Sequence, residues 1–359
     1  MSITSELTSK ERLNRVYHSE AVDHTPVLGG WIACPDHIAA IMGVSLNDYW
    51  KNPIKVSIEA YQKLGTDGLV DICVPMAKED YRIVDANSYS KASTGKTLEE
   101  TIQTIDDLPS AGEIEQSFDF EGEFREFKDN QLKYQNMLGN MLYHPAQWSA
   151  GAKLNWYSDF GYENFFMIVG LYPDHALKLM EVGGAYGYCK SKVIARAINE
   201  GIFPKAVFLG EDICTQRGPM ISPDYLEKYY APQLKHGLEP LLEVGCRPVW
   251  HCDGDVRLLL DMLLDCGVQG FQGFQPECGM KIEDIVQKRT KEGKPLLIFG
   301  PLAVTTELPV YTPEQIKARV KQVVDICKGN ADLALFTSNT INPDVPLENI
   351  YAMYEAVRE

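Results

Sequence analysis

The chain has 359 residues, 45% of them hydrophobic, which is enough to bury the core of one large α/β domain or of two smaller ones. Its 50 acidic and 34 basic residues give a net charge of −16, which argues against nucleic acid or an anionic membrane surface as the main partner. Nine cysteines without a CxxC pair, and the lack of an apolar run that could span a bilayer, predict a reduced, cytoplasmic protein.

Short apolar runs alternate with helical patterns along most of the chain. Most of these runs lack the period-2 alternation of half-exposed strands, as expected for parallel strands that are buried on both faces. The eight predicted strands are Thr25–Trp31, Gly68–Val74, Gln135–Tyr143, Ala206–Glu211, Pro248–Asp253, Gly270–Gln275, Pro295–Gly300 and Ala334–Ser338. Eight such strands with helices between them predict an α/β protein with a (β/α)8 barrel, the TIM-barrel fold, as one domain over residues 1–359.

Residues 77–130 interrupt this pattern. They are polar and rich in Asp, Glu, Ser, Thr and Gly, and we expect them to form an insertion or lid in the N-terminal half of the barrel. Helix signals are clearer elsewhere. For example, Thr312–Gln315 has the pattern of a capping box, which marks the start of a helix. The glycines of Gly183–Gly187 lie inside a helical stretch, so helix packing accounts for them better than phosphate binding does.

Polar residues follow several of the predicted strands. His251 and Asp253 come at the end of the fifth strand, where alternation turns both side chains the same way. Glu211 and Asp212 end the fourth strand, and Asn339 follows the eighth. In a parallel barrel these ends meet at one pocket. The alternative is that the acids cap the helices that follow, and that His251 and Asp253 form an internal hydrogen-bonded pair.

A histidine and carboxylates at one pocket are donors for zinc or a similar ion. The candidate metal ligands are His251, Asp253 and Glu211, and the alternative is an acid–base cluster without a metal. Cys252 is adjacent to this set, but strand alternation turns its thiol into the barrel wall.

Other large side chains lie near the predicted strand ends or in the loops after them. They form a pocket suited to an aromatic ligand if they face the barrel mouth, although core packing explains each of them equally well. These residues are Trp31, Met76, Tyr143, His144 and Trp148.

An ordered set of motifs resembles the uroporphyrinogen decarboxylase superfamily over nearly the whole chain. Each motif alone is weak, but together they are specific, and family members are (β/α)8 barrels. The matching segments are Lys10–Arg12, Asp23–Pro26, Gly210–Ile213, Gly218–Pro223, His251–Asp255, Pro276–Met280, Ser338–Ile341 and Pro346–Ile350.

The decarboxylase branch of this superfamily grips its tetrapyrrole through an arginine-rich segment after the first strand. The matching stretch here, Gly29–Pro35, contains no arginine. The family also uses an aspartate after the second strand, where we compare the stretch Ile72–Met76, which has none. A tetrapyrrole with many carboxylates needs cationic partners, so these departures argue against porphyrinogen decarboxylation.

The other branch is similar to corrinoid-dependent methyltransferases. Thiol-directed members hold zinc through His-x-Cys and a later cysteine. Here His251 matches the histidine, but Asp253 stands at the cysteine and Asn339 near the later one. The resemblance therefore favours enzymes that demethylate methoxylated, mostly aromatic compounds and pass the methyl group to cobalamin on a separate corrinoid protein. The resemblance does not decide whether the protein binds zinc or whether it forms a homodimer.

In this hypothesis His251 is the general acid or metal ligand, oriented by Asp253 or Glu211, because an alkoxide or phenolate leaves badly unless its oxygen is protonated or bound by an electrophile. Asp212 and Asn339 position the substrate, and the contacts beyond them are Trp31, Met76 and His144. Two alternatives stay open: transfer from a methylated corrinoid to a thiol or folate, and a binding barrel without catalysis.

Overall fold

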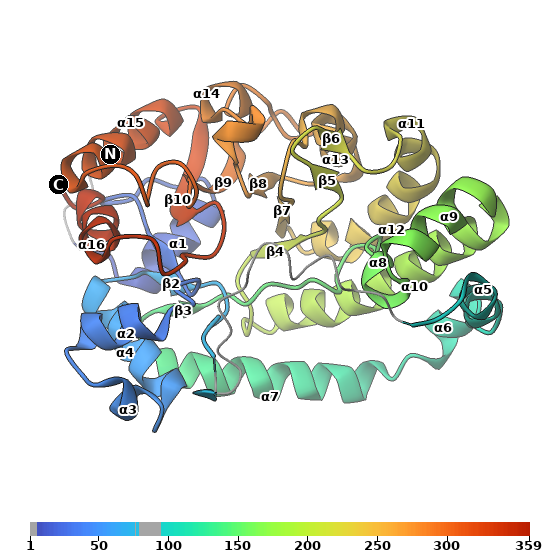
Figure 1. The fold of residues 1–359 in the computed structure, drawn as a ribbon, viewed down its shortest axis with the longest axis horizontal. Helices are drawn as coiled ribbons and strands as arrows, with labels where there is room; N and C mark the ends of the chain where they lie inside the picture. Colours follow the sequence, from blue (N-terminus) through green and yellow to red (C-terminus); the bar gives the residue numbers. More distant parts are fainter. Residues whose placement is uncertain (1–5, 76, 79–94) are drawn as a thin grey trace.

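The computed structural model describes residues 6–75, 77–78 and 95–359 (Figure 1). Its strands form two parallel sheets. The first sheet has the order β1-β2-β3 and the second β10-β9-β8-β7-β4, so each strand neighbours the next one in the barrel sequence. The strands are β1 Leu28–Gly29, β2 Gly68–Leu69, β3 Leu142–Tyr143, β4 Ala206–Gly210, β7 Arg247–His251, β8 Gly270–Gln272, β9 Leu296–Leu302 and β10 Ala331–Thr337.

Two joints close these sheets into a barrel. A parallel bridge pairs Val27, next to β1, with Leu335 of β10. On the other side, the Gln147 N–H after β3 donates to the Phe208 carbonyl of β4 at 2.7 Å. The predicted (β/α)8 barrel is therefore confirmed, and each of the eight predicted strands overlaps one of its strands. The third prediction was too long, because residues 135–138 are the last turn of a helix rather than strand.

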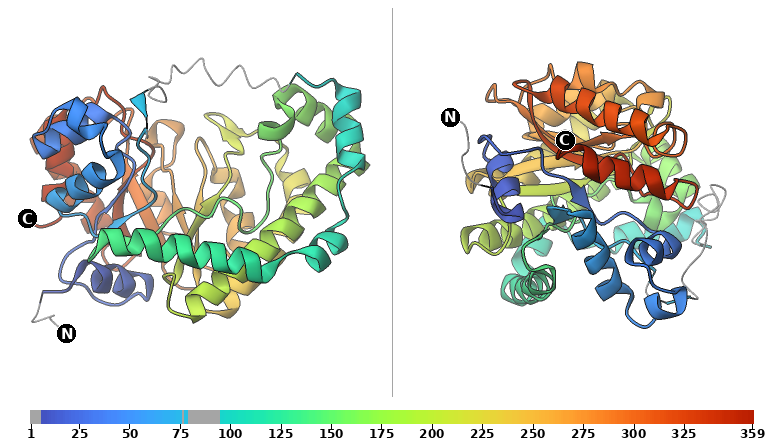
Figure 2. Two further views of the ribbon diagram at one scale, coloured as in Figure 1. Left: turned by 90° about the horizontal axis from the view of Figure 1, so that it is seen from below. Right: turned by 90° about the vertical axis from the view of Figure 1, so that its left-hand side faces the viewer.

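Helices cover the outside of the barrel (Figures 1 and 2). They are α1 Ser9–Tyr17, α2 Pro35–Met42, α3 Leu46–Tyr49, α4 Pro53–Leu64, α5 Leu98–Asp106, α6 Ala111–Ser117, α7 Phe120–Leu138, α8 Tyr157–Phe160, α9 Tyr162–Leu171, α10 Pro173–Asn199, α11 Pro223–Tyr225, α12 Ala231–Glu243, α13 Leu260–Cys266, α14 Ile282–Ile285, α15 Pro313–Cys327 and α16 Leu347–Ala356. A short antiparallel pair, β5 Cys214–Thr215 and β6 Gly218–Pro219, follows β4. Of the helices in the described residues, none has the length and apolar character that crossing a membrane requires.

The predicted insertion at residues 77–130 is helical where the structure describes it, and residues 79–94 lie outside the described part. Capping boxes open α5 at Thr97 and α6 at Ser110, which explains the polar composition of this stretch. The helix α7 packs against α4, α10 and β3. It therefore belongs to the barrel wall, and the boundary expected at residue 130 falls inside it.

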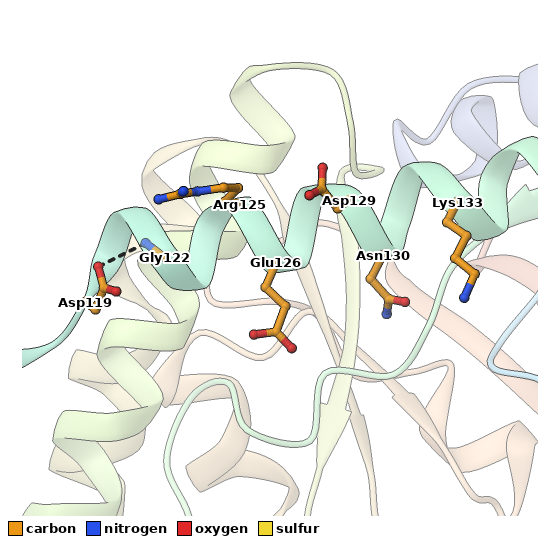
Figure 3. Close-up of a pocket in the computed structure, with 7 residues that line it drawn as sticks. All are labelled: Asp119, Gly122, Arg125, Glu126, Asp129, Asn130 and Lys133. Atoms are coloured by element: carbon orange, nitrogen blue, oxygen red, sulfur yellow. Dashed lines mark hydrogen bonds between the residues drawn. The ribbon is translucent and has the colours of Figure 1, made fainter.

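A shallow groove runs along the outside of α7 (Figure 3). Its lining consists of the N-cap and side chains of this one helix, from Asp119 to Lys133. Asp119 accepts a hydrogen bond from the Gly122 N–H at 3.0 Å and so caps the helix. No strand end contributes to this groove, so it is not the pocket that the sequence predicts.

The close approach of α10 and α12 to the loop after β3 depends on glycine. A Cβ on Gly187 would lie 2.0 Å from the Gly151 carbonyl oxygen, and one on Gly237 would lie 1.7 Å from the same atom. Helix packing is thus the role of the glycine-rich stretch at 183–187, as predicted.

The inside of the barrel is filled by large apolar side chains, and α1 covers the ends at which the strands begin. Leu13, Val16 and Tyr17 of α1 lie in this interior cluster, and α1 contacts β2, β3 and β10. The cluster includes Leu28, Phe208, Val249, Leu297, Phe299, Ala334 and Phe336. In such a barrel the reactive side chains lie at the opposite rim, where the strands end.

His144 belongs to this interior. Its ring is fully buried, with Nε2 at 2.9 Å from the Ala206 carbonyl oxygen and Nδ1 at 3.0 Å from the Tyr17 hydroxyl. Because a carbonyl oxygen only accepts, Nε2 carries the proton and Nδ1 accepts from Tyr17. The prediction that His144 contacts substrate is wrong, since both ring nitrogens are engaged inside the core.

Burial lowers the pKa of His144 to about 4. An unfolded histidine titrates near pH 6.5. Between these two values the unfolded chain binds a proton that the folded chain refuses. We therefore expect His144 alone to lower the free energy of unfolding by about 3 kcal/mol as the pH drops from 6.5 to 4, on top of the contributions of other titrating groups. Urea unfolding at several pH values measures this slope. In His144→Gln the slope should lose this component, whereas the exposed His236→Gln should keep it.

Candidate functional site

Three side chains converge where β4 and β7 end. Asp212 follows β4, His251 is the last residue of β7, and Asp253 lies two residues further on. His251 Nε2 is 3.4 Å from Asp212 Oδ1 and 4.0 Å from Asp253 Oδ1. One ligand atom from each of the three side chains lies within 4.8 Å of the others. The sequence prediction that His251 and Asp253 share one side of the strand end is consistent with this geometry.

Backbone contacts between the two loops hold this cluster together. The Asp253 N–H donates to Asp212 Oδ1 at 3.0 Å, and the Asp255 N–H donates to the Thr215 carbonyl at 2.9 Å. Cys252 is buried and points away from the cluster, with its thiol 3.1 Å from the Asp253 carbonyl oxygen. The side chain of Asp255 pairs with Arg257 instead of joining the cluster.

Asp253 is the more buried of the two acids in the cluster. Its Oδ2 accepts a hydrogen bond from Asn339 Nδ2 at 2.7 Å, but its buried Oδ1 has no hydrogen-bond partner among the described residues. Burial raises the pKa of Asp253, and the neighbouring Asp212 raises it further, whereas His251 lowers it. A buried carboxylate oxygen without a donor is costly. A proton or a metal ion between His251 and the two carboxylates would remove that cost.

The donor set fits a divalent cation. One imidazole nitrogen and two carboxylate oxygens are ligands that zinc, iron(II), cobalt(II) and manganese(II) accept. In the described part of the chain, this is the one group of three or more such side chains with ligand atoms close enough to share an ion. His251, Asp212 and Asp253 would hold the ion.

Aromatic rings surround the imidazole of His251. Trp148, Trp31 and Phe208 have ring centroids 5.4, 5.9 and 5.8 Å from it. Trp148 is 43% exposed, so its ring lies where a ligand from solvent would meet the cluster. Trp31 is buried, and its indole N–H has no hydrogen-bond partner in the described structure. The site therefore combines a polar cluster with an apolar, aromatic wall.

Glu211 does not have the place that the sequence predicts for it. Its carboxyl is buried and accepts backbone hydrogen bonds from Asn155, at 3.2 Å, and from Leu154. Burial raises the pKa of Glu211 to about 8. The structure places Asp212 rather than Glu211 in the cluster, and the imidazole of His251 is oriented by Gln272. The predictions of Glu211 as a metal ligand and as the group orienting His251 are therefore wrong. Met76 lies outside the described residues.

Sequence reasoning missed two residues at this rim. Gln272, the last residue of β8, has its Oε1 against His251 Nδ1. Asp71 lies two residues after the end of the second barrel strand, in a left-handed backbone conformation with φ 63°. Burial raises the pKa of Asp71 to about 6, and its carboxylate accepts from the Ala146 N–H at 3.2 Å. The sequence signal for Asp71 is a single acidic residue inside an apolar run.

Asp71 corrects one of the two sequence arguments against a tetrapyrrole decarboxylase. The predicted strand Gly68–Val74 was too long, so the stretch compared with the family began one residue late. An aspartate does follow the second strand. The lack of arginine in Gly29–Pro35 is unaffected, and it is the sequence argument against porphyrinogen decarboxylation that is left.

Comparison with known proteins agrees with the barrel and with the sequence motifs. Residues 194–359 match the family model for uroporphyrinogen decarboxylase (URO-D). A solved methyltransferase from Methanosarcina mazei has the same fold, with a TM-score of 0.63 over 98% of this chain and 99% of that one, at 17% sequence identity. No curated protein matches the sequence. The second half of the chain is thus similar in sequence to the uroporphyrinogen decarboxylase family, and nearly the whole chain shares the fold of that methyltransferase.

Proposed function

We propose that this protein is a corrinoid-dependent methyltransferase that takes a methyl group from a methoxylated, aromatic donor and passes it to cobalamin, the cob(I)alamin form, on a partner corrinoid protein. The cluster of His251, Asp212 and Asp253 beside exposed Trp148 is the observation that carries this proposal. The match of the second half of the chain to the URO-D family model and the shared fold with a protein named a methyltransferase support the same reaction class.

The chemical need is a better leaving group. Cob(I)alamin is the nucleophile, so the protein has to assist departure of the ether oxygen, whose conjugate phenol has a pKa of about 10. His251 Nε2 lies near two carboxylates and can hold a proton for that oxygen. A divalent cation bound by the same three side chains would act there as a Lewis acid. Asn339 fixes Asp253, and Asp253 with Asp212 favours positive charge at this point.

The aromatic wall suits the proposed donor. A methoxyarene is flat and apolar apart from its ether oxygen, and aromatic rings pack well against one another. Trp148 offers an exposed ring 5.4 Å from the centre of the imidazole. The first loop has no arginine to bind an array of carboxylates, which favours a neutral donor over a polycarboxylate.

The direct test incubates the purified protein with guaiacol or veratrole and reduced cobalamin, and follows methylcobalamin formation by absorbance. The proposal requires demethylated product and methylcobalamin in equal amounts. Metal analysis before and after treatment with a chelator, followed by addition of zinc or cobalt(II), shows whether the cluster works with a metal ion. If neither methoxyarene yields methylcobalamin, with or without metal, while methylcobalamin is consumed with a thiol or folate, transfer runs in the opposite direction.

Trp148→Ala is expected to raise the KM for a methoxyarene by about 3–10-fold with a smaller change in kcat, because an aromatic pair contributes about 0.5–1.5 kcal/mol. Tyr186 on α10 is equally exposed at 43% and is the matched control. Steady-state kinetics on Trp148→Ala and Tyr186→Ala make the comparison. Equal kinetics in both variants would mean that Trp148 does not contact the donor.

A further inference from the structure

Two carbonyl groups fix the amide of Gln272 in one orientation. Its Nε2 lies 2.8 Å from the Thr337 carbonyl oxygen and 3.1 Å from that of Ser338. Carbonyl oxygens only accept hydrogen bonds, so the NH2 group must face them. The Oε1 of this buried residue therefore faces the other way, and it lies against Nδ1 of His251.

This orientation decides where His251 carries its proton. An amide oxygen also only accepts, so Nδ1 of His251 is the donor to Gln272. The neutral ring then has its lone pair on Nε2, the nitrogen that faces the Oδ1 atoms of Asp212 and Asp253 at 3.4 and 4.0 Å. Three electron-rich atoms point at one place, which suits a cation there.

The fold places Gln272 and His251 together by strand register. Parallel pairing of β7 and β8 sets His251 opposite Gln272. The next residue, Gly273, has a φ of +97°, and a Cβ at this position would lie 3.2 Å from His251 Nδ1. A side chain at Gly273 would therefore press on the imidazole while straining the backbone.

We infer that Gln272 is a positioning residue that holds the proton of His251 on Nδ1 and so presents the Nε2 lone pair to a divalent cation between Asp212 and Asp253. This inference rests on the cluster of the proposed function. Without the amide oxygen, the neutral ring would move its proton to Nε2, where Asp212 is the available acceptor. The ring would then no longer be a ligand. Mutation of a residue that hydrogen-bonds to a metal ligand typically lowers metal affinity by about 10–100-fold.

Nuclear magnetic resonance of metal-free protein labelled with ¹³C and ¹⁵N in histidine tests the inference without any methyl transfer. His251→Gln assigns the His251 ring signals, and spectra are taken at a pH where that ring is neutral. The wild type should show protonated Nδ1 and unprotonated Nε2. In Gln272→Leu the pattern should reverse. The control is Gln131→Leu, since Gln131 is equally buried but donates to the Tyr143 carbonyl, away from the cluster. It should match the wild type.

Cobalt(II) titration gives the second readout. Gln272→Leu should bind cobalt(II) about 10–100-fold more weakly than the wild type, and Gln131→Leu equally well. The inference is overturned if Gln272→Leu keeps the wild-type ring pattern, or if Gln131→Leu changes it as much. Failure of the wild type to bind cobalt(II) or zinc would refute the metal part of the proposed function and the ligand role, whereas a missing methyl transfer with normal metal binding would refute only the reaction.

Discussion

His251→Gln is expected to lower the rate of methyl transfer to cobalamin by about 10²–10⁴-fold, the range that general acid assistance supplies. Glutamine fills a similar space but can neither be protonated nor offer an imidazole lone pair. The loss should appear in kcat more than in KM, because the group acts on the leaving oxygen. Single-turnover assays with guaiacol and reduced cobalamin measure the chemical step directly.

Two controls separate this effect from damage to the fold. His236→Gln changes a half-exposed histidine that stacks on Tyr188, and it should leave the rate unchanged. Circular dichroism and thermal unfolding should show both variants folded. A folded His251→Gln enzyme that works within a factor of two of the wild type would mean that the imidazole is neither the acid nor a necessary ligand.

Arg12→Leu should give the largest loss of stability. Arg12 is 4% exposed, and its guanidinium binds Asp23 at 2.7 Å and Asp67, which in turn accepts from the Val27 N–H at 2.9 Å. Removing it leaves the buried Asp67 carboxylate without its cation. Such a change costs about 3–5 kcal/mol, a large part of the total stability of a typical domain. Urea unfolding at pH 7 followed by circular dichroism measures it.

The comparison residue for this prediction lies on the same helix. Arg15 is 40% exposed and meets Glu20 only at 4.0 Å, so Arg15→Leu should cost less than about 1 kcal/mol. Hydrogen bonds from Arg12 also hold the pKa of Asp23 well below its ordinary value. That contribution is present above about pH 4 and is lost as the pH falls further. Equal losses in the two variants would show that the Arg12 network does not stabilise the fold.

The barrel could be predicted from sequence because its strands are buried on both faces and read as separate apolar runs. Strand ends were less accurate. The third strand was extended over residues 135–138, where apolar and polar residues fit the last turn of α7 equally well. The second was extended past Leu69, which hid Asp71 inside an apparent strand. Local pattern does not mark the residue at which a strand stops when apolar residues continue beyond it.

The direction of the site side chains could be predicted only where side chains alternate regularly along a strand. His251 and Asp253 could be placed together because β7 ends at His251 and the next residues keep that direction. At β4 the chain turns at Gly210, with φ 144°, and alternation no longer says which of Glu211 and Asp212 faces the pocket. Gln272 was missed because its contact with His251 depends on the register between two strands, which the sequence does not give. An amide side chain also does not by itself indicate an acid–base or metal site, as a carboxylate does.

The three side chains of the cluster and the two amides that hydrogen-bond to it all lie after residue 194: Asp212, His251, Asp253, Gln272 and Asn339. The family pattern covers this same part of the chain. Two of the rings around the imidazole, Trp31 and Trp148, belong to the other half. Under the proposed function, the reactive groups and most of the aromatic contacts to the donor would come from different halves of one barrel. If that proposal holds, exchanging the loops after β1 and β3 would be a way to redirect the protein to other donors while the cluster around His251 stays unchanged.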